Sequence, residues 1–232
     1  MEKTLKFKGM MSELDRLFKV GKKYHIATKF KELPVKTQLS LSWIDKTSNL
    51  LRFSWGRCIF KGAFNPGTEV YINTGNRYAY GKVVSNSGDL VVEFKELREQ
   101  PEFIKRRTVR VEPDPANPVI VEFTVDSYKL KVMAKDISET GVGVILEKDT
   151  PASSDVIELI QKRPSSWFDL YVYLPKYGKA HAKGRVRNLN ISEEGIYIRI
   201  GFEVEYSEKD KDKVRRYVLE RQQEIIKALK ML

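Results

Sequence analysis

Residues 118–146 read PVIVEFTVDSYKLKVMAKDISETGVGVIL, and this stretch decides the fold. Apolar and polar residues alternate along much of it with the period of two that is typical of a half-buried strand. The pattern predicts strands over Pro118–Val125, Lys129–Ala134 and Gly141–Leu146, with polar turns between them. Short strands joined by polar turns indicate a small β-barrel or β-sandwich.

The pattern continues towards the carboxyl end of the chain. Three further strands are expected, over Phe168–Leu174, Lys179–Leu189 and Gly195–Val204. The last two are predicted to form a long hairpin whose turn is Asn190–Glu194. With the preceding strands they complete one antiparallel barrel.

Two helices are expected in the same half. A short one is predicted around Asp155–Gln161, inside a loop from Lys148 to Ser166. The second begins at Ser207, which has the side chain of an N-cap and is followed by acidic residues. Apolar residues then recur at helical spacing, at Val214, Val218, Ile225, Leu229 and Leu232. The first half of this helix is expected to cover the open end of the barrel, and its last two turns are left to pair with the other domain or with a second copy in a homodimer.

The amino-terminal half shows a second set of alternating segments. They are Gly21–Phe30, Thr37–Ile44, Leu50–Trp55, Val70–Ile72, Arg77–Val84 and Leu90–Phe94, and Leu33–Pro34 is expected to break the first of them. The stretch from Glu96 to Ile104 is charged and has no strong strand pattern. We therefore predict a β-barrel domain over residues 1–97, a basic linker over 98–110, and a second β-barrel domain with the helix over 111–232. The fold class is mainly β, with two small antiparallel barrels joined by a short linker and a C-terminal α-helix.

Composition bounds the class of protein. The 232 residues are 41% hydrophobic, enough for a buried core, and contain no apolar run of about 18 residues that predicts a membrane span. The start of the chain has no apolar signal core, and the single Cys58 cannot form an internal disulfide, so a cytoplasmic protein is expected. The net charge of +11 indicates either an anionic partner or a lysine-rich solvated surface.

The sequence offers no apparatus for catalysis. Two histidines and one cysteine cannot supply a metal cluster, and no Ser-His-Asp or Cys-His set stands in a convincing context. We expect no catalytic residues, no metal and no cofactor, and therefore no enzyme.

A run of cations, Lys105-Arg106-Arg107-Thr108-Val109-Arg110, lies on the predicted linker. Arg106 and Arg110 are four residues apart, so they share a face on a helix or converge on a turn. A guanidinium matches the geometry of a phosphate and also stacks on flat rings. The run therefore predicts a site for a ligand with phosphates and aromatic bases, or else a basic solvated linker.

A second stretch, Asp136-Ile137-Ser138-Glu139-Thr140-Gly141, follows a predicted strand. Period-two geometry places Asp136 and Ser138 on one side of the chain. An ionised carboxylate accepts the N1–H and N2–H pair of a guanine edge, and the hydroxyl adds a further bond. Gly141 allows a positive φ or a close backbone approach. The alternative is an ordinary Asx turn before a strand.

In order and spacing, these two stretches resemble the motifs of the PilZ family of receptors for the bacterial second messenger cyclic di-GMP. The family pattern is Arg-x-x-x-Arg followed by Asp/Asn-x-Ser-x-x-Gly. Arg106 and Arg110 match the first motif, and Asp136, Ser138 and Gly141 match the second. The resemblance covers about residues 104 to 223, and the first 95 residues look more loosely like the amino-terminal barrel of the two-domain, flagellar-brake type.

The resemblance implies a role for each residue. The two motif arginines bind phosphate and stack on guanine, while the aspartate and serine read a guanine edge. The position before the first motif arginine, often arginine where the family binds a ligand pair, is Lys105 here, which leaves one or two ligands per site open. Arg107 is a further basic candidate within the motif.

The resemblance also implies the function. The chain is expected to be a signalling effector that binds cyclic di-GMP, with a linker that closes on the ligand and reorients the two domains. Its output is expected to control motility or surface attachment, through a protein target such as the flagellar motor. The alternative is a nucleic-acid-binding protein that uses two small basic barrels.

Overall fold

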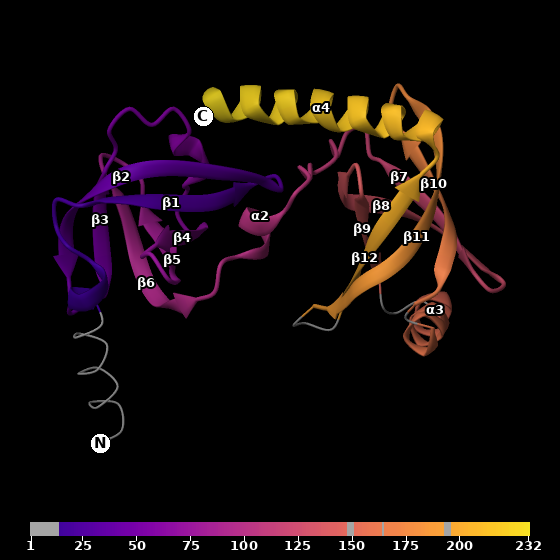
Figure 1. The fold of residues 1–232 in the computed structure, drawn as a ribbon, viewed down its shortest axis with the longest axis horizontal. Helices are drawn as coiled ribbons and strands as arrows, with labels where there is room; N and C mark the ends of the chain where they lie inside the picture. Colours follow the sequence, from indigo (N-terminus) through magenta and orange to yellow (C-terminus); the bar gives the residue numbers. More distant parts are fainter. Residues whose placement is uncertain (1–13, 148–150, 164, 193–195) are drawn as a thin grey trace, which may run out of the picture. The chain divides into compact units, whose positions relative to one another are not determined.

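A computed structural model describes residues 14–147, 151–163, 165–192 and 196–232. The chain divides into two compact units, residues 1–106 with 226–232, and residues 107–225. Each unit contains one closed antiparallel barrel of six strands (Figure 1). The predicted fold class, two small β-barrels with a C-terminal helix, is confirmed.

The first barrel has the strand order β1-β2-β3-β6-β5-β4. Its strands are β1 (Lys23–Phe30), β2 (Leu33–Asp45), β3 (Leu50–Ser54), β4 (Glu69–Asn73), β5 (Tyr78–Ser85) and β6 (Leu90–Arg98). A 3-10 turn, η1 (Lys61–Ala63), precedes β4, and a single helical turn, α2 (Glu102–Lys105), follows β6.

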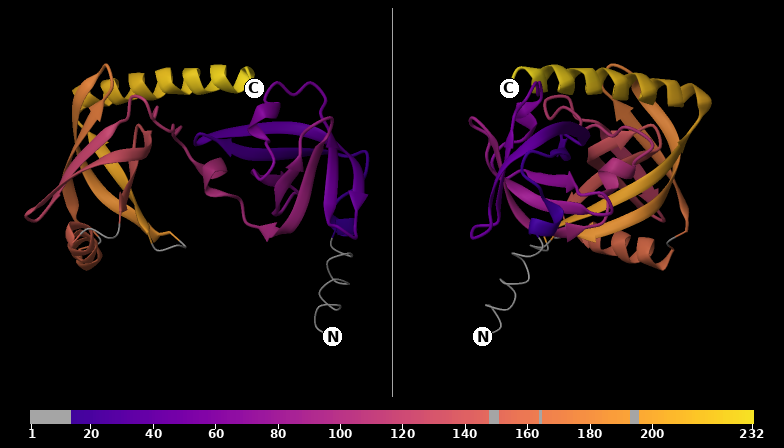
Figure 2. Two further views of the ribbon diagram at one scale, coloured as in Figure 1. Left: turned by 180° about the vertical axis from the view of Figure 1, so that it is seen from behind. Right: turned by 60° about the vertical axis from the view of Figure 1, so that its left-hand side comes forward.

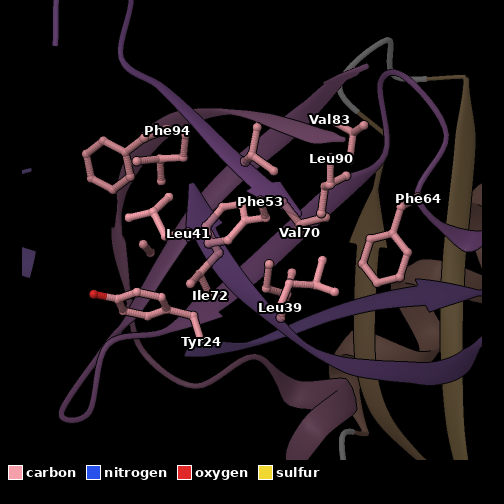
Figure 3. Close-up of a cluster of buried hydrophobic side chains, with 14 of the residues drawn as sticks. Tyr24, Leu39, Leu41, Phe53, Phe64, Val70, Ile72, Val83, Leu90 and Phe94 are labelled. Carbon is pink, nitrogen blue, oxygen red and sulfur yellow. The ribbon is translucent and has the colours of Figure 1, made fainter. Parts of the chain in front are cut away.

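Apolar side chains of alternating strand positions fill the first barrel (Figure 3). Leu41, Phe53 and Leu90 are fully buried there, as the period of two requires. Leu229, near the end of the last helix, belongs to the same cluster and is 3% exposed. The final apolar positions of the helix are therefore part of the core of the first unit.

β1 ends at Phe30 as expected, but Leu33 and Pro34, expected to lie in the break after it, are the first residues of β2. Pro34 pairs with Lys29, and Leu33 pairs with Phe30, so the hairpin turns on two residues. Those residues, Lys31 and Glu32, have φ values of 47° and 69°. Two left-handed residues give the turn the twist of a tight hairpin, so that Leu33 and Pro34 can pair back onto β1 at once.

The second barrel has the strand order β10-β11-β12-β9-β8-β7. Its strands are β7 (Ile120–Val125), β8 (Tyr128–Ser138), β9 (Gly141–Glu147), β10 (Trp167–Leu174), β11 (Gly178–Ile191) and β12 (Tyr197–Tyr206). The expected strands all occur, with β8 four residues longer at its end. Parts of the expected turn at 190–194 and of the loop from Lys148 lie outside the described residues.

Helices lie at both ends of the second barrel (Figure 2). Helix α3 (Pro151–Lys162) is longer than the short helix expected, and α4 (Glu208–Lys230) begins next to Ser207, whose hydroxyl accepts a hydrogen bond from the Asp210 amide at 3.3 Å. Val214 and Val218 are buried on the first turns of α4. The expected cover over the barrel end is therefore present.

Gly81 provides a test of packing in the first barrel. An added Cβ at this position would lie 2.5 Å from the backbone oxygen of Glu93, so the strands must shift to accept it. We expect Gly81→Ala to lower the free energy of unfolding by about 1–3 kcal/mol in denaturant titrations. Gly56→Ala is the matched control, because nothing lies within 4 Å of its added Cβ. Equal stability of the two variants would contradict this packing.

Candidate functional site

Asp136 lies on the outer face of the second barrel, two residues before the end of β8. Its neighbour Ile137 is buried in the interior, and the alternation of the strand places Asp136 on the opposite side. Asp136 pairs with Gly143 of β9, which in turn pairs with Gly201 of β12. The aspartate is nevertheless 0% exposed, so other side chains must cover it.

The covering groups are two guanidiniums. Nη1 of Arg110 donates to Oδ1 of Asp136 at 3.4 Å, and Nη2 of Arg199 donates to Oδ2 at 2.5 Å. Arg199 comes from the outward-facing positions of β12, and its side chain is 38% exposed. An ion pair with one fully buried member is stronger than a surface pair, because solvent screens it less.

Backbone pairing brings Arg110 to this position. The amide of Val111 donates to the carbonyl of Ile137 at 3.0 Å, and the amide of Ile137 donates back to the carbonyl of Val111 at 3.0 Å. Because this bridge is antiparallel, it places Arg110 opposite Ser138, and the Arg110 side chain reaches diagonally to Asp136. The second arginine of the first motif therefore meets the aspartate of the second motif.

Glycine at position 143 leaves room for the aspartate. A Cβ added there would lie 2.6 Å from Oδ2 of Asp136, closer than real Cβ contacts allow. A Cβ added at Gly201 would lie 2.2 Å from Oδ1 of Asn188 on β11. Polar side chains of β8 and β11 thus lie flat over glycines of the two strands between them.

Ser138 and Gly141 pair with each other across the two-residue turn after β8. The Ser138 hydroxyl, 1% exposed, donates to the carbonyl of Gly141 at 3.3 Å and accepts from the amide of Thr140 at 3.4 Å. Gly141 is not left-handed. Its small size matters instead, since an added Cβ would lie 3.2 Å from the carbonyl oxygen of Phe202 and 3.7 Å from Nη2 of Arg110.

Arg106, the first arginine of the motif, belongs to the first unit. It follows α2, and its Nη1 donates to Oε2 of Glu32 at 3.0 Å. Its side chain is 20% exposed. Lys105 and Arg107 are exposed and, among the described residues, their side chains have no hydrogen-bond or ion-pair partner. The four cations of the run therefore differ in how available they are to an anion.

The sequence did not identify Arg199. The available signal was the alternation of Tyr197–Tyr206, which places Arg199 and Glu203 on the outer face of the barrel. That pattern marks a polar face but does not say that β12 lies beside β9, and only this neighbour relation brings Arg199 to Asp136.

A hollow with an apolar lining in the second barrel lies elsewhere. It has a volume of about 790 Å³ and an apolar lining that includes Ile120, Leu130, Met133 and Ile145. None of the seven predicted site residues lines it. We place the candidate site at Asp136 because charged groups of both motifs meet there.

Metal and membrane features are absent from the described part of the chain. Residues 14–147, 151–163, 165–192 and 196–232 contain no group of three or more His, Cys, Asp or Glu side chains placed to hold a metal. No helix within the same ranges has the length and apolar character needed to cross a bilayer.

Comparisons with known proteins cover either the carboxyl-terminal half or nearly the whole of the chain. The PilZ domain family matches residues 104–220. An uncharacterized protein of Aquifex aeolicus (strain VF5) is 70% identical over 232 residues, which is the whole of both chains. The solved complex of MrkH from K. pneumonia with c-di-GMP is 13% identical, covers 96% of this chain and 94% of its own, and has a TM-score of 0.49. YcgR from Escherichia coli in complex with c-di-GMP is also 13% identical, covers 97% and 92%, and has a TM-score of 0.42.

The Arg199 ion pair is expected to contribute to the stability of the second barrel. We expect Arg199→Met to lower the free energy of unfolding by about 1 kcal/mol, because Asp136 keeps only the longer contact to Arg110. Arg187→Met is the control. Its guanidinium is 55% exposed, and its partner Glu203 also binds Arg185, so we expect a change below about 0.5 kcal/mol. Denaturant titrations that show no difference between the variants would contradict the assigned importance of Arg199.

Proposed function

Because the chain belongs to the PilZ family, we propose that it is a non-catalytic receptor for cyclic di-GMP. The observation that carries the proposal is the contact between Arg110 and Asp136, which joins the two motifs on one face of the second barrel. The PilZ family binds this ligand, and the chain supplies each residue type of the family motifs at its expected spacing.

The proposed roles follow from the chemistry of each group. The carboxylate of Asp136 and the hydroxyl of Ser138 read a guanine edge, with the carboxylate accepting from N1–H and N2–H. Arg110 and Arg106 bind phosphate and stack on guanine, since a guanidinium does both. Lys105 and Arg107 add positive charge near the phosphates. Lys105 lacks a flat stacking surface. We therefore propose that the other residues of the site determine how many ligands the protein binds.

Arg199 has a supporting role in this proposal. Before the ligand binds, Arg110 and Arg199 hold the Asp136 carboxylate in place through hydrogen bonds to its two oxygens. When a guanine edge approaches, the longer contact to Arg110 is the one that is easier to exchange. Arg199 then keeps the carboxylate oriented, and Arg110 becomes available to the ligand.

The proposed interactions supply enough free energy for micromolar binding of the ligand. A micromolar affinity corresponds to about 8 kcal/mol. Charge-assisted hydrogen bonds are worth about 1.5–3 kcal/mol each, and a stacked guanidinium adds about 1 kcal/mol. A few such interactions supply the affinity after the linker has been ordered.

We further propose that ligand binding changes the arrangement of the two units. The basic linker, residues 98–110, closes on the ligand and reorients the two units in this proposal. A ligand that binds one arrangement of the linker better than another shifts the population towards that arrangement. The output is control of motility or surface attachment through a protein target such as the flagellar motor, in the cytoplasm.

Calorimetric titration tests the ligand and the motif arginines. We expect cyclic di-GMP to bind and cyclic di-AMP and GTP to bind much more weakly, because adenine lacks the N1–H and N2–H pair and GTP lacks the second base. Arg106→Ala or Arg110→Ala is expected to lower affinity at least about tenfold while the protein stays folded. Arg163→Ala is the control, because this arginine pairs with Asp126 away from the motifs. Retained affinity in both motif variants would remove the proposed site.

Salt dependence separates this function from binding of nucleic acid. A ligand with two charges gives a plot of log affinity against log salt with a slope no steeper than about −2. A nucleic acid that contacts six or more phosphates gives a slope of about −4 or steeper. We expect the shallow slope with cyclic di-GMP and no gel-shift binding of nucleic acid at physiological salt. Tight binding of nucleic acid with no response to cyclic dinucleotides would replace the proposal.

A further inference from the structure

Glu32 lies in a turn that glycine or asparagine would fit better. Lys31 and Glu32 have φ values of 47° and 69°, and a left-handed backbone is unfavourable for residues of this type. Tight hairpin turns of this length favour Asn-Gly, which relieves that strain. The chain instead has a glutamate, and its side chain is directed into the protein, where it is only 5% exposed.

The carboxylate is bound on both oxygens. Oε1 accepts from Nζ of Lys29 at 2.7 Å, and Oε2 accepts from Nη1 of Arg106 at 3.0 Å. Burial raises the pKa of Glu32, but the hydrogen bonds and charges of Lys29 and Arg106 outweigh it and hold the pKa below its usual range. Glu32 is therefore an anion at neutral pH.

The segment that carries Arg106 is anchored in the same unit. Phe103 of α2 is buried, and its ring packs edge-on against Tyr71 of β4 with centroids 5.5 Å apart. Helix α2 ends at Lys105, so Arg106 extends from an anchored turn towards the β1–β2 hairpin. Lys105 and Arg107 have no such partner among the described residues. The first barrel therefore binds one cation of the run and leaves its neighbours exposed.

We propose that Glu32 is an affinity-determining residue, an internal anion that competes with the phosphate of the ligand for Arg106. A carboxylate and a phosphate both offer a guanidinium two negatively charged oxygens that accept a bidentate pair of charge-assisted hydrogen bonds. A dinucleotide that uses Arg106 must first displace Glu32, and this lowers the apparent affinity. The inference rests on the proposed function, because it assigns a competitor to one of the proposed ligand-binding arginines.

The exchange also links the ligand to the first barrel. Once Arg106 leaves, Glu32 keeps only Lys29 as a partner, in a hairpin turn that already has two unfavourable backbone conformations. Ligand binding thus changes the contacts of the β1–β2 turn, although the ligand does not touch that turn. In the ligand-free protein, Arg106 stays bound to Glu32. In the ligand-bound protein, Glu32 has lost its contact to Arg106.

Glu32→Gln tests the competition, since it keeps the shape of the side chain and removes its charge. We expect it to bind cyclic di-GMP roughly three- to tenfold more tightly than the wild-type chain in calorimetry. Glu93→Gln is the matched control. Glu93 is a glutamate of the same barrel, and it pairs with Lys95 at the exposed surface. The Glu93→Gln variant is expected to bind cyclic di-GMP with the affinity of the wild type.

Glu32→Gly is a second variant, included because it removes the carboxylate without straining the turn. Glycine accepts a φ of 69° without strain, so this variant removes the carboxylate and favours the turn. We expect it to bind as tightly as Glu32→Gln, and trypsin to cut the ligand-free chain after Arg106 faster in both variants than in the wild type or in Glu93→Gln.

The outcomes separate this inference from the function on which it rests. If the wild type binds cyclic di-GMP and neither Glu32 variant binds more tightly, the competitor role is overturned and the receptor stands. If neither the wild type nor the Glu32 variants bind, the receptor and the competitor fall together. Tighter binding with unchanged trypsin cleavage at Arg106 also overturns the inference, because Arg106 was then not held by Glu32.

Discussion

The buried carboxylate of Asp136 is the constraint on which the candidate site depends. A carboxylate with no exposed surface is stable only when cations or hydrogen-bond donors surround it. Arg110 and Arg199 meet this requirement from opposite ends of the second unit's sequence. Removing the carboxylate would leave two guanidiniums side by side, so the acid and the two cations stabilise one another as a set.

The barrel determines which residues can join this set. Glycines at 143 and 201 leave the outer face flat, so that Asp136 and Asn188 lie across the neighbouring strands. A closed barrel has no free edge, and each outer face is fixed by the register of its strands. A shift of register by one residue would turn Asp136 inwards, where the apolar core offers no donor. The same pairing that closes the barrel therefore orients the site.

Period-two alternation predicted most of the strands and both barrels, because burial on one face leaves a direct trace in the sequence. Asp136, Ser138 and Arg110 were found because their spacing along the chain matches a motif. Arg199 was not, because its position beside Asp136 depends on β12 pairing with β9, and alternation does not specify which strands are neighbours. Leu33 and Pro34 were expected in the break after Phe30 but belong to β2, because Lys31 and Glu32 form the turn with a left-handed backbone that these residue types usually avoid.

The two motif arginines have acidic partners of different kinds. Arg110 pairs with an acid of the motif itself, and Arg106 pairs with an acid of the β1–β2 turn, outside the motif. An anion that binds either motif arginine must displace an acid, whereas the exposed Lys105 and Arg107 require no such exchange. In the proposed function a phosphate replaces Glu32 at Arg106, and a guanine donor edge replaces Arg110 at Asp136, which keeps Arg199. The pairing therefore favours a ligand that carries both groups over a simple polyanion.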